Sequence, residues 1–295
     1  IRLCDQLPNV KYKYSREIAI AFHQWDVFEW LCENKFDLSH HSQEEQNLIN
    51  HCILYSNFTS FAYLSRFEFN FNSALQFAIR FDCLLLTKWL LRHRSQFYKE
   101  SDSDSEEGIY LYHACRNGNK EILLLLLNDN NYNNVNSTYE GETPLFTCAH
   151  YGYFELFSIL IQRPEINLNT RNYLGSQIIH FACECENIDY LKYLLTYKFN
   201  EIDINSLDNS GSTPLHCACS QLNFKAVELL FNHKDILKPN IRNMYGFTPL
   251  MTIIIQKRDE NLTLSYIKYF YENVKIEERA SLFKTEVKSG MNVLD

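Results

Sequence analysis

Two pairs of closely spaced cysteines come nearest to a chemical motif in this sequence. One residue separates Cys183 from Cys185, and one separates Cys217 from Cys219. Cysteine thiolates bind zinc, and a structural zinc site needs four ligands that converge in a tetrahedron. Both pairs lie in patterns that predict helices, where residues two positions apart do not face each other. The spacing therefore predicts no metal site, and we expect these thiols to pack as small buried apolar groups.

No other arrangement of residues predicts catalysis. His40 and His41 lie in a polar stretch that offers them no organised partner. The sequence contains no nucleophile elbow, phosphate-binding loop, HExxH helix or dinucleotide fingerprint. All eight glycines fall at or within one residue of a turn in the repeats described next, so none remains for a phosphate loop. We therefore expect a chain that is not an enzyme and that binds no cofactor.

The elements that would position these residues belong to an internal repeat. The motif Thr-Pro-Leu begins at Thr143, Thr213 and Thr248, and a glycine stands two positions before each. A fourth glycine precedes a degenerate copy of the motif, and the four are separated by 34, 36 and 35 residues: Gly141, Gly175, Gly211 and Gly246. Such a period is typical of arrays built from one repeated pair of helices.

Each copy of the repeat has the chemistry of a turn followed by two helices. Glycine takes a positive-φ turn position, threonine can cap the next helix, and proline fits the first helical position. A short helix with small residues follows, as at Cys148-Ala149 and Ala218-Cys219, and then a helix with an apolar stripe. An Asn-rich turn such as Asn167-Leu168-Asn169 ends the copy. Small residues in the first helix would let neighbouring copies stack closely.

These motifs resemble ankyrin repeats, whose pattern contains Thr-Pro-Leu-His. The resemblance covers residues 109–295, with the last copy cut short after Gly290, and it implies an all-α solenoid of stacked helix–turn–helix units with short hairpin loops. It also implies that His180 and His216 hydrogen-bond to the backbone of the turn. Three cysteines occupy the place where the family prefers alanine: Cys115, Cys183 and Cys219.

The first hundred residues differ because they contain no glycine. Apolar patterns over 18–31, 48–64 and 74–91 nevertheless predict helix pairs, and the region resembles the divergent helical part that precedes the repeats in many protozoan ankyrin proteins. We interpret residues 1–100 as degenerate repeats, with a separate helical domain as the alternative. Residues 101–108 form a Ser/Asp/Glu-rich segment that predicts a solvated loop, with phosphorylation as the alternative.

The resemblance also indicates where a partner would bind, since hairpin tips and the exposed side of the first helix line a concave surface in ankyrin proteins. The corresponding candidates in this sequence are Tyr139, Glu140, Glu142, His150, Tyr151, Tyr173, Leu174, Glu184, Ser212, Gln221, Met244, Tyr245 and Phe247. Tyr, Phe and Met are enriched in the cores of interfaces. An aromatic content of 15% would also place tyrosines at many positions by chance.

The composition also bears on the class of partner and on the cellular compartment. The net charge of −8, with no basic stripe, argues against nucleic acid as a partner. The longest apolar run, residues 122–127, is too short to span a membrane. Ten cysteines within helical patterns indicate a reducing, intracellular and cytoplasmic setting. Because the chain begins at Ile1 and stops just after a turn signal, we interpret it as a piece of a longer protein.

We therefore expect a monomeric scaffold or adaptor that binds a protein partner on an aromatic, mildly acidic repeat surface. The alternative is a targeting segment of a larger enzyme, such as a kinase or ubiquitin ligase, whose catalytic domain lies outside this chain.

Overall fold

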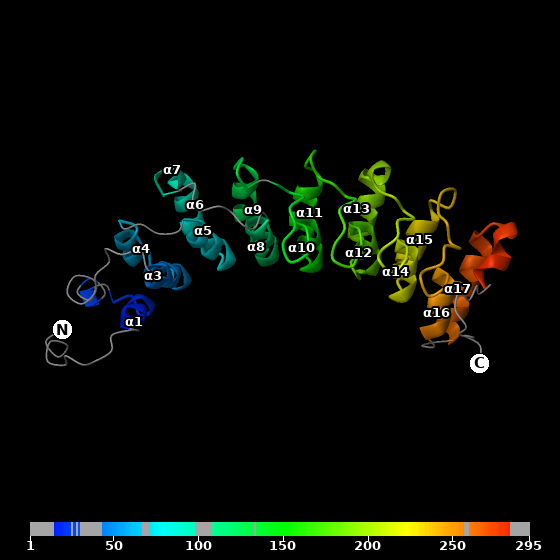
Figure 1. Ribbon diagram of the computed structural model, residues 1–295. Helices are drawn as coiled ribbons and strands as arrows, with labels where there is room; N and C mark the ends of the chain where they lie inside the picture. The colour runs from blue at the N-terminus through cyan, green and yellow to red at the C-terminus, as the bar shows by residue number, and fades with distance from the viewer. Residues whose placement is uncertain are drawn as a thin grey trace. The chain divides into compact units, whose positions relative to one another are not determined.

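The computed structural model describes residues 15–24, 26–27, 29, 43–66, 71–97, 108–132, 134–256 and 260–283. The elements in these ranges are helices, which confirms the all-α prediction. The chain divides into two compact units, Ile1–Tyr139 and Glu140–Asp295, and each is described by itself. Figure 1 labels the α-helices along the chain. None of the described helices combines the length and apolar character needed to cross a membrane.

The first unit consists of paired helices that stack in chain order. Its described helices are α1 (Ser15–Ala21), α3 (Gln43–Leu54), α4 (Phe58–Leu64), α5 (Phe71–Arg80), α6 (Leu84–Arg92), α7 (Arg94–Phe97), α8 (Ile109–Asn117) and α9 (Lys120–Leu127). Helix α1 contacts α3, α3 contacts α5, and α5 contacts α8, while α6 contacts α9. The stacking of α5 on α8 joins the helices of the first hundred residues to the region where the sequence predicts repeats.

The second unit repeats this arrangement. Its helices are α10 (Pro144–His150), α11 (Phe154–Ile161), α12 (Ile178–Glu184), α13 (Asp189–Tyr197), α14 (Pro214–Ser220), α15 (Phe224–Phe231), α16 (Pro249–Gln256) and α17 (Glu260–Asn273), with the 3₁₀ turns η3 (Phe199–Glu201) and η4 (Ile276–Leu282). The first helices of successive pairs pack on one another, α10 on α12, α12 on α14 and α14 on α16. The second helices pack likewise where α13 meets α15.

The Thr-Pro-Leu motif begins the first helix of a pair as the sequence predicts. The hydroxyl oxygens of Thr143 and Thr213 accept hydrogen bonds from the backbone N–H groups three residues on, each at 3.4 Å. A proline follows each threonine at the start of the helix, where a missing N–H costs nothing. In the third copy, Thr248 accepts in the same way from Met251.

Most of the described turns between paired helices share one geometry, although the turn between α12 and α13 does not. The residue before the second helix donates its N–H to a small residue five positions back, over 2.8 Å from Cys83 to Ala78 and 2.8 Å from Tyr153 to Cys148. The residue directly before this donor, which follows the end of the first helix, has a positive φ, as at Asp82 and Gly152. The same bond joins Asn57 to Cys52, Asn119 to Ala114 and Asn223 to Ala218. This arrangement is a Schellman-type helix end.

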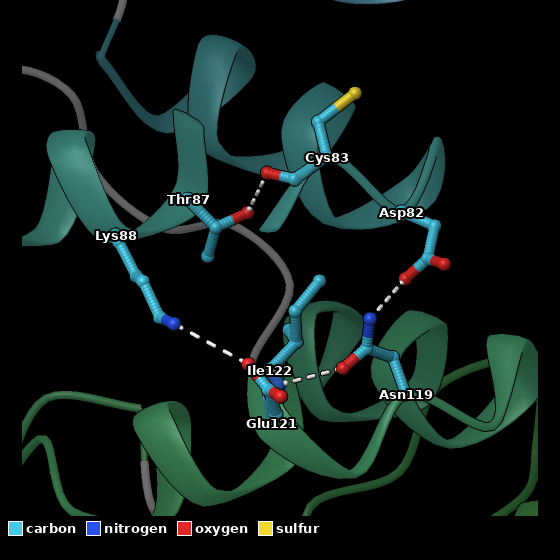
Figure 2. Close-up of polar contacts among 7 residues, drawn as sticks. All are labelled: Asp82, Cys83, Thr87, Lys88, Asn119, Glu121 and Ile122. Atoms are coloured by element: carbon cyan, nitrogen blue, oxygen red, sulfur yellow. Dashed lines mark hydrogen bonds and ion pairs between the residues drawn. The ribbon is translucent and has the colours of Figure 1, made fainter. Parts of the chain in front are cut away.

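Asparagine at the start of the second helix holds neighbouring pairs together. Figure 2 shows that Asn119 Oδ1 accepts from the N–H of Ile122 at 2.9 Å, while its Nδ2 donates to Asp82 Oδ1 at 2.6 Å. Asn57 likewise caps α4 and donates to the carbonyl of Ile20 at 3.0 Å. An exposed Lys88–Glu121 ion pair beside Asn119 adds little, because water screens such pairs.

The shared turn and the shared asparagine support the interpretation of residues 1–100 as degenerate repeats, which stays a prediction. The predicted partition at 101–108 also stays a prediction, because residues 98–107 lie outside the described part. His40, His41 and the expected further repeat at residues 290–294 lie outside it as well.

Candidate functional site

Three hairpin tips of the second unit, at 172–176, 208–212 and 243–247, are fixed by one polar side chain each. Asp208 Oδ1 accepts from the backbone N–H groups of Ser210 and Ser212, both at 2.8 Å. Asn172 makes the same pair of bonds two and four residues on, at 2.9 and 3.0 Å, and so does Asn243, at 3.1 Å each. These side chains satisfy the backbone of the turn, so each tip holds one conformation.

Successive tips stack on one another through the backbone. The N–H of Asn209 donates to the carbonyl of Leu174 at 3.0 Å, and the N–H of Met244 donates to Ser210 at 2.8 Å. A Cβ atom at Gly175 would lie 2.1 Å from the side-chain oxygen of Asn209, and φ there is +73°. Glycine is therefore required both for the turn and for the close approach of the next tip. The tips at 172–176, 208–212 and 243–247 form one continuous row.

The outward side chains of this row are apolar at its two ends. Tyr173 is 67% exposed and Leu174 54% exposed, while Met244 and Tyr245 reach 75% and 72%. The middle tip presents the polar Asn209 and Ser210 instead. Because the backbone of the tips is already ordered, a partner that covers these apolar side chains need not order the loop as well, which suits the side chains to be binding anchors.

The exposed ends of the first helices lie beside the tips. His150, at the end of α10, contacts Glu142 with Nδ1 3.2 Å from Oε1, and its ring stacks on Tyr151 at 5.3 Å. Glu184 occupies the same place at the end of α12. In α14 that place is Ser220, followed by the exposed Gln221. We call the tips 140–142, 172–176, 208–212 and 243–247, together with these helix ends, the tip face.

Ser212 and Phe247, two of the predicted binding residues, make contacts that stabilise the tip face itself. The hydroxyl of Ser212 accepts from that of Ser210 at 2.9 Å, inside the middle tip. The carbonyl of Phe247 accepts from His216 Nε2 at 2.9 Å, and its half-buried ring stacks on Tyr245 at 6.4 Å. Glu140, in contrast, is exposed at a positive φ of 53°.

Tyr139 lies in the first unit and does not protrude freely. It is half-buried, with its ring 5.0 Å from that of Tyr112 and 6.0 Å from that of His113. Tyr139, Tyr173 and Tyr245 are the tip tyrosines among the binding residues that the sequence predicts. Tyr173 and Tyr245 are the two that stand exposed on the tip face, and the role of Tyr139 stays a prediction.

Sequence reasoning did not identify the apolar end of α16 as part of this face. Ile255 occupies the place that His150, Glu184 and Ser220 take in the earlier repeats, and it is 44% exposed. Gln256 Nε2 then donates to the carbonyl of Ser220 at 2.7 Å, which ties α16 to α14. Counting positions from the Thr-Pro-Leu motif would have found Ile255.

The motif histidines are structural, as the resemblance implies. His216 Nδ1 accepts from the N–H of Thr213 at 3.0 Å, and His180 Nδ1 accepts from that of Gln177 at 3.2 Å. His180 Nε2 lies 3.0 Å from the carbonyl of Ser206. Burial lowers the pKa of both imidazoles, that of His216 to about 4. Each ring therefore joins the start of its own helix to the tip region of the next repeat.

The cysteine pairs show no arrangement for a metal. Among the described residues no group of three His, Cys, Asp or Glu side chains converges as a metal site would require. Cys183 and Cys219 are fully buried, and burial raises the pKa of both thiols well above the usual range. Burial likewise raises the pKa of Cys185 to about 12. Of the two cysteine pairs, Cys183, Cys217 and Cys219 are packed as small buried apolar groups, as expected, whereas Cys185 is half-buried.

A pocket of about 760 Å³ lies elsewhere in the second unit, where α15 and α17 end. Phe231 and Val274 lie among its apolar residues, and Lys234, Lys275 and Arg279 are among its charged ones. The ends of α15 and α17, the 3₁₀ turn η4 and the loops between them line the pocket, and no sequence motif predicts it.

Comparison with known proteins agrees with this architecture. The model of the family described as ankyrin repeats (3 copies) matches residues 98–172 and 179–279, more than half of the chain. The chain is also similar to alpha-latrocrustotoxin-Lt1a of Latrodectus tredecimguttatus, with 33% identity over 78 residues. That stretch is 26% of this chain and only 5% of the length of the toxin. With its tips, capped helices and stacked pairs, the chain belongs to the ankyrin-repeat family.

Proposed function

We propose that this chain is a scaffold or adaptor that binds a protein partner on the tip face of its second unit. Ankyrin repeats are in general protein–protein interaction modules, and the observation that carries the proposal is the pair of exposed apolar tips. Tyr173 and Tyr245 are about two-thirds or more exposed on backbone that hydrogen bonds hold in place. Aromatic anchors of this kind dominate the energetics of many interfaces.

We further propose that the chain acts by binding alone, as a monomer inside the cell, without catalysis. In the second unit the motif histidines are engaged by backbone groups and the thiols of the cysteine pairs have raised pKa values. These groups support the shape of the repeats, and the exposed polar residues of the tip face are suited to contacts across an interface.

The test compares the double variant Tyr173→Ala/Tyr245→Ala with the unchanged chain as bait for proteins in a cell extract. Truncating a central aromatic anchor costs about 2 kcal/mol or more in binding, so captured partners should fall at least about thirty-fold in affinity. Surface substitutions change folding by about 0.5 kcal/mol or less, so the thermal melt should stay unchanged.

Tyr197→Ala is the matched control, because Tyr197 on α13 is 70% exposed and lies outside the tip face. Lys192→Ala on the same helix controls for a change of charge. Both should keep every partner. Full capture by the double tyrosine variant would move the binding site away from the tip face.

A further inference from the structure

An asparagine followed by a glycine is prone to spontaneous deamidation, and this chain contains the pair once, at Asn117-Gly118. The backbone nitrogen after an asparagine attacks the carbon of the side-chain amide, and glycine hinders this attack least because it has no Cβ atom. The pair lies in the first unit, where Asn117 is the last residue of α8 and Gly118 follows with a φ of +74°.

The side-chain amide of Asn117 joins two neighbouring helices. Its Nδ2 donates to the carbonyl of Ile79 at 2.8 Å and to that of Arg80 at 3.1 Å. Both carbonyls belong to the last turn of α5, where a helix leaves its carbonyl groups without a partner of its own. Asn117 therefore caps the end of α5 from the end of α8, at the place where the two helices pack.

The folded helix end restrains both nitrogens that take part in deamidation. The N–H of Gly118 donates to the carbonyl of Cys115 at 3.2 Å, while Nδ2 of Asn117 is bonded to α5. Closure of the ring requires the backbone to leave the helical conformation at Asn117, which would break these bonds. The packed junction of α5 and α8 thus protects a pair of residues that would react readily in an open chain.

We propose that Asn117 is a deamidation site controlled by the fold, which reacts when the junction of α5 and α8 opens and whose product then weakens that junction. This inference concerns the first unit and does not depend on the proposed function of the tip face. Deamidation at this site is a covalent record of how often the junction has opened.

The reaction needs only water. The backbone nitrogen of Gly118 loses its proton to water or hydroxide and forms a bond to Cγ of Asn117. The bond from Cγ to Nδ2 breaks, and Nδ2 leaves as ammonia with a proton taken from water. Water then opens the five-membered imide, either at Cγ, which leaves aspartate, or at the backbone carbonyl, which leaves isoaspartate.

Neither product suits the junction. A carboxylate has no N–H to donate, so the carbonyls of Ile79 and Arg80 would face a negative charge in place of two hydrogen bonds. That charge would also lie at the C-terminal ends of α5 and α8, where the helix dipole disfavours it. Isoaspartate lengthens the main chain by one carbon at the same place.

The first experiment measures deamidation of the full chain in native buffer and in urea above the unfolding midpoint, at the same mildly alkaline pH. Mass spectrometry of the chymotryptic peptide that contains Asn117 gives the fraction in which the amide has become a carboxylate. We expect the native chain to react about ten-fold more slowly or less, because a packed helix end opens rarely.

The decisive variant is Leu75→Ala, which leaves a cavity in α5 and keeps the Asn117-Gly118 pair itself unchanged. Leu75 is fully buried, so its loss should open the junction more often and raise the rate in native buffer about ten-fold or more. The matched control Leu215→Ala makes the same change at a buried position of α14 in the second unit and should leave the rate at Asn117 unchanged. In urea all three chains should react at one rate.

The effect of the product is measured on Asn117→Asp, which carries the carboxylate directly. Hydrogen exchange should be several-fold faster at the ends of α5 and α8 than in Asn117→Ala, which removes the same two bonds without adding a charge. Asn130→Asp adds a carboxylate to an exposed residue after α9 and should leave this exchange unchanged.

Four results would overturn the proposal. Equal rates in native buffer and in urea, or no reaction of Asn117 in urea, would show that the fold does not control the site. A rate in Leu75→Ala equal to that of the unchanged chain would exclude opening of the junction as the controlling step. Exchange in Asn117→Asp no faster than in Asn117→Ala would show that the product does not weaken the junction.

Discussion

Acid should weaken the repeats through His216, and the size of the effect follows from the contacts of its ring. Nδ1 accepts the N–H of Thr213 at 3.0 Å, and Nε2 lies 2.9 Å from the carbonyl of Phe247, to which it donates. The ring is 2% exposed. A proton on Nδ1 would break the first bond and bury a charge, and burial accordingly lowers the pKa from 6.5 to about 4.

The direction of the effect follows from which state binds the proton. Above pH 6.5 the imidazole is neutral in both states, and His216 makes stability independent of pH there. As the pH falls below 6.5 the unfolded chain takes up a proton that the folded chain does not, so stability is lost until the pH reaches about 4. A difference of about 2.5 pKa units corresponds to roughly 3 kcal/mol in all, of which about 2 kcal/mol is lost by pH 5.

Urea denaturation at pH 7.5 and pH 5.0 measures this loss in the unchanged chain and in His216→Gln. Glutamine at the third helical position can still accept the N–H of the capping residue, but it does not titrate. The unchanged chain should lose about 2 kcal/mol more than the variant between the two pH values. Burial lowers the pKa of His180 as well, so part of the pH dependence should remain in the variant. Equal losses in the two proteins would refute the argument.

Two further predictions concern the stacking of repeats and the thiols. Gly211→Val puts a side chain 3.2 Å from the backbone nitrogen of Met244, and Leu215→Asp buries a charge. Each variant should reduce hydrogen-exchange protection in both adjacent repeats. Loss of protection confined to one repeat would contradict nearest-neighbour coupling. A bulky thiol reagent should react with the part-exposed Cys83 and Cys185 before the buried Cys183 and Cys219. A chelator should leave the melting temperature unchanged, and a drop in melting temperature would indicate a metal site.

The second unit was predictable from sequence because its turns require residues that are recognisable there. Glycine at the tips and Thr-Pro at the helix starts have few alternatives, so their spacing predicts the repeat directly. The first hundred residues use the same helix end with Ser56 and Asp82 at the positive-φ position, φ 52° and 60°. A search for glycine passes over such turns, and only the backbone bonds reveal them.

The sequence predicts the positions of the candidate binding residues but not which of their side chains are exposed. The repeat pattern places a tyrosine at residue 139 as readily as at 173 or 245. Whether the ring protrudes depends on its neighbours, and Tyr112 and His113 lie against Tyr139 from helix α8. The contacts of Arg171 with the carbonyls of Gly175 and Leu207 are equally invisible in sequence.

The tips separate the residues that fix the backbone from those that meet a partner. An Asn or Asp side chain, a glycine and a bond to the neighbouring tip recur in the second unit, at 172–176, 208–212 and 243–247. The two residues before the glycine differ among the three tips: Tyr173-Leu174, Asn209-Ser210 and Met244-Tyr245. The recurring bonds involve only backbone atoms of Leu174, Ser210 and Tyr245, although in the middle tip the hydroxyl of Ser210 also donates to Asp208 Oδ1 at 2.7 Å. These bonds place little constraint on the side chains of Leu174 and Tyr245, as the proposed binding role of the tip face requires.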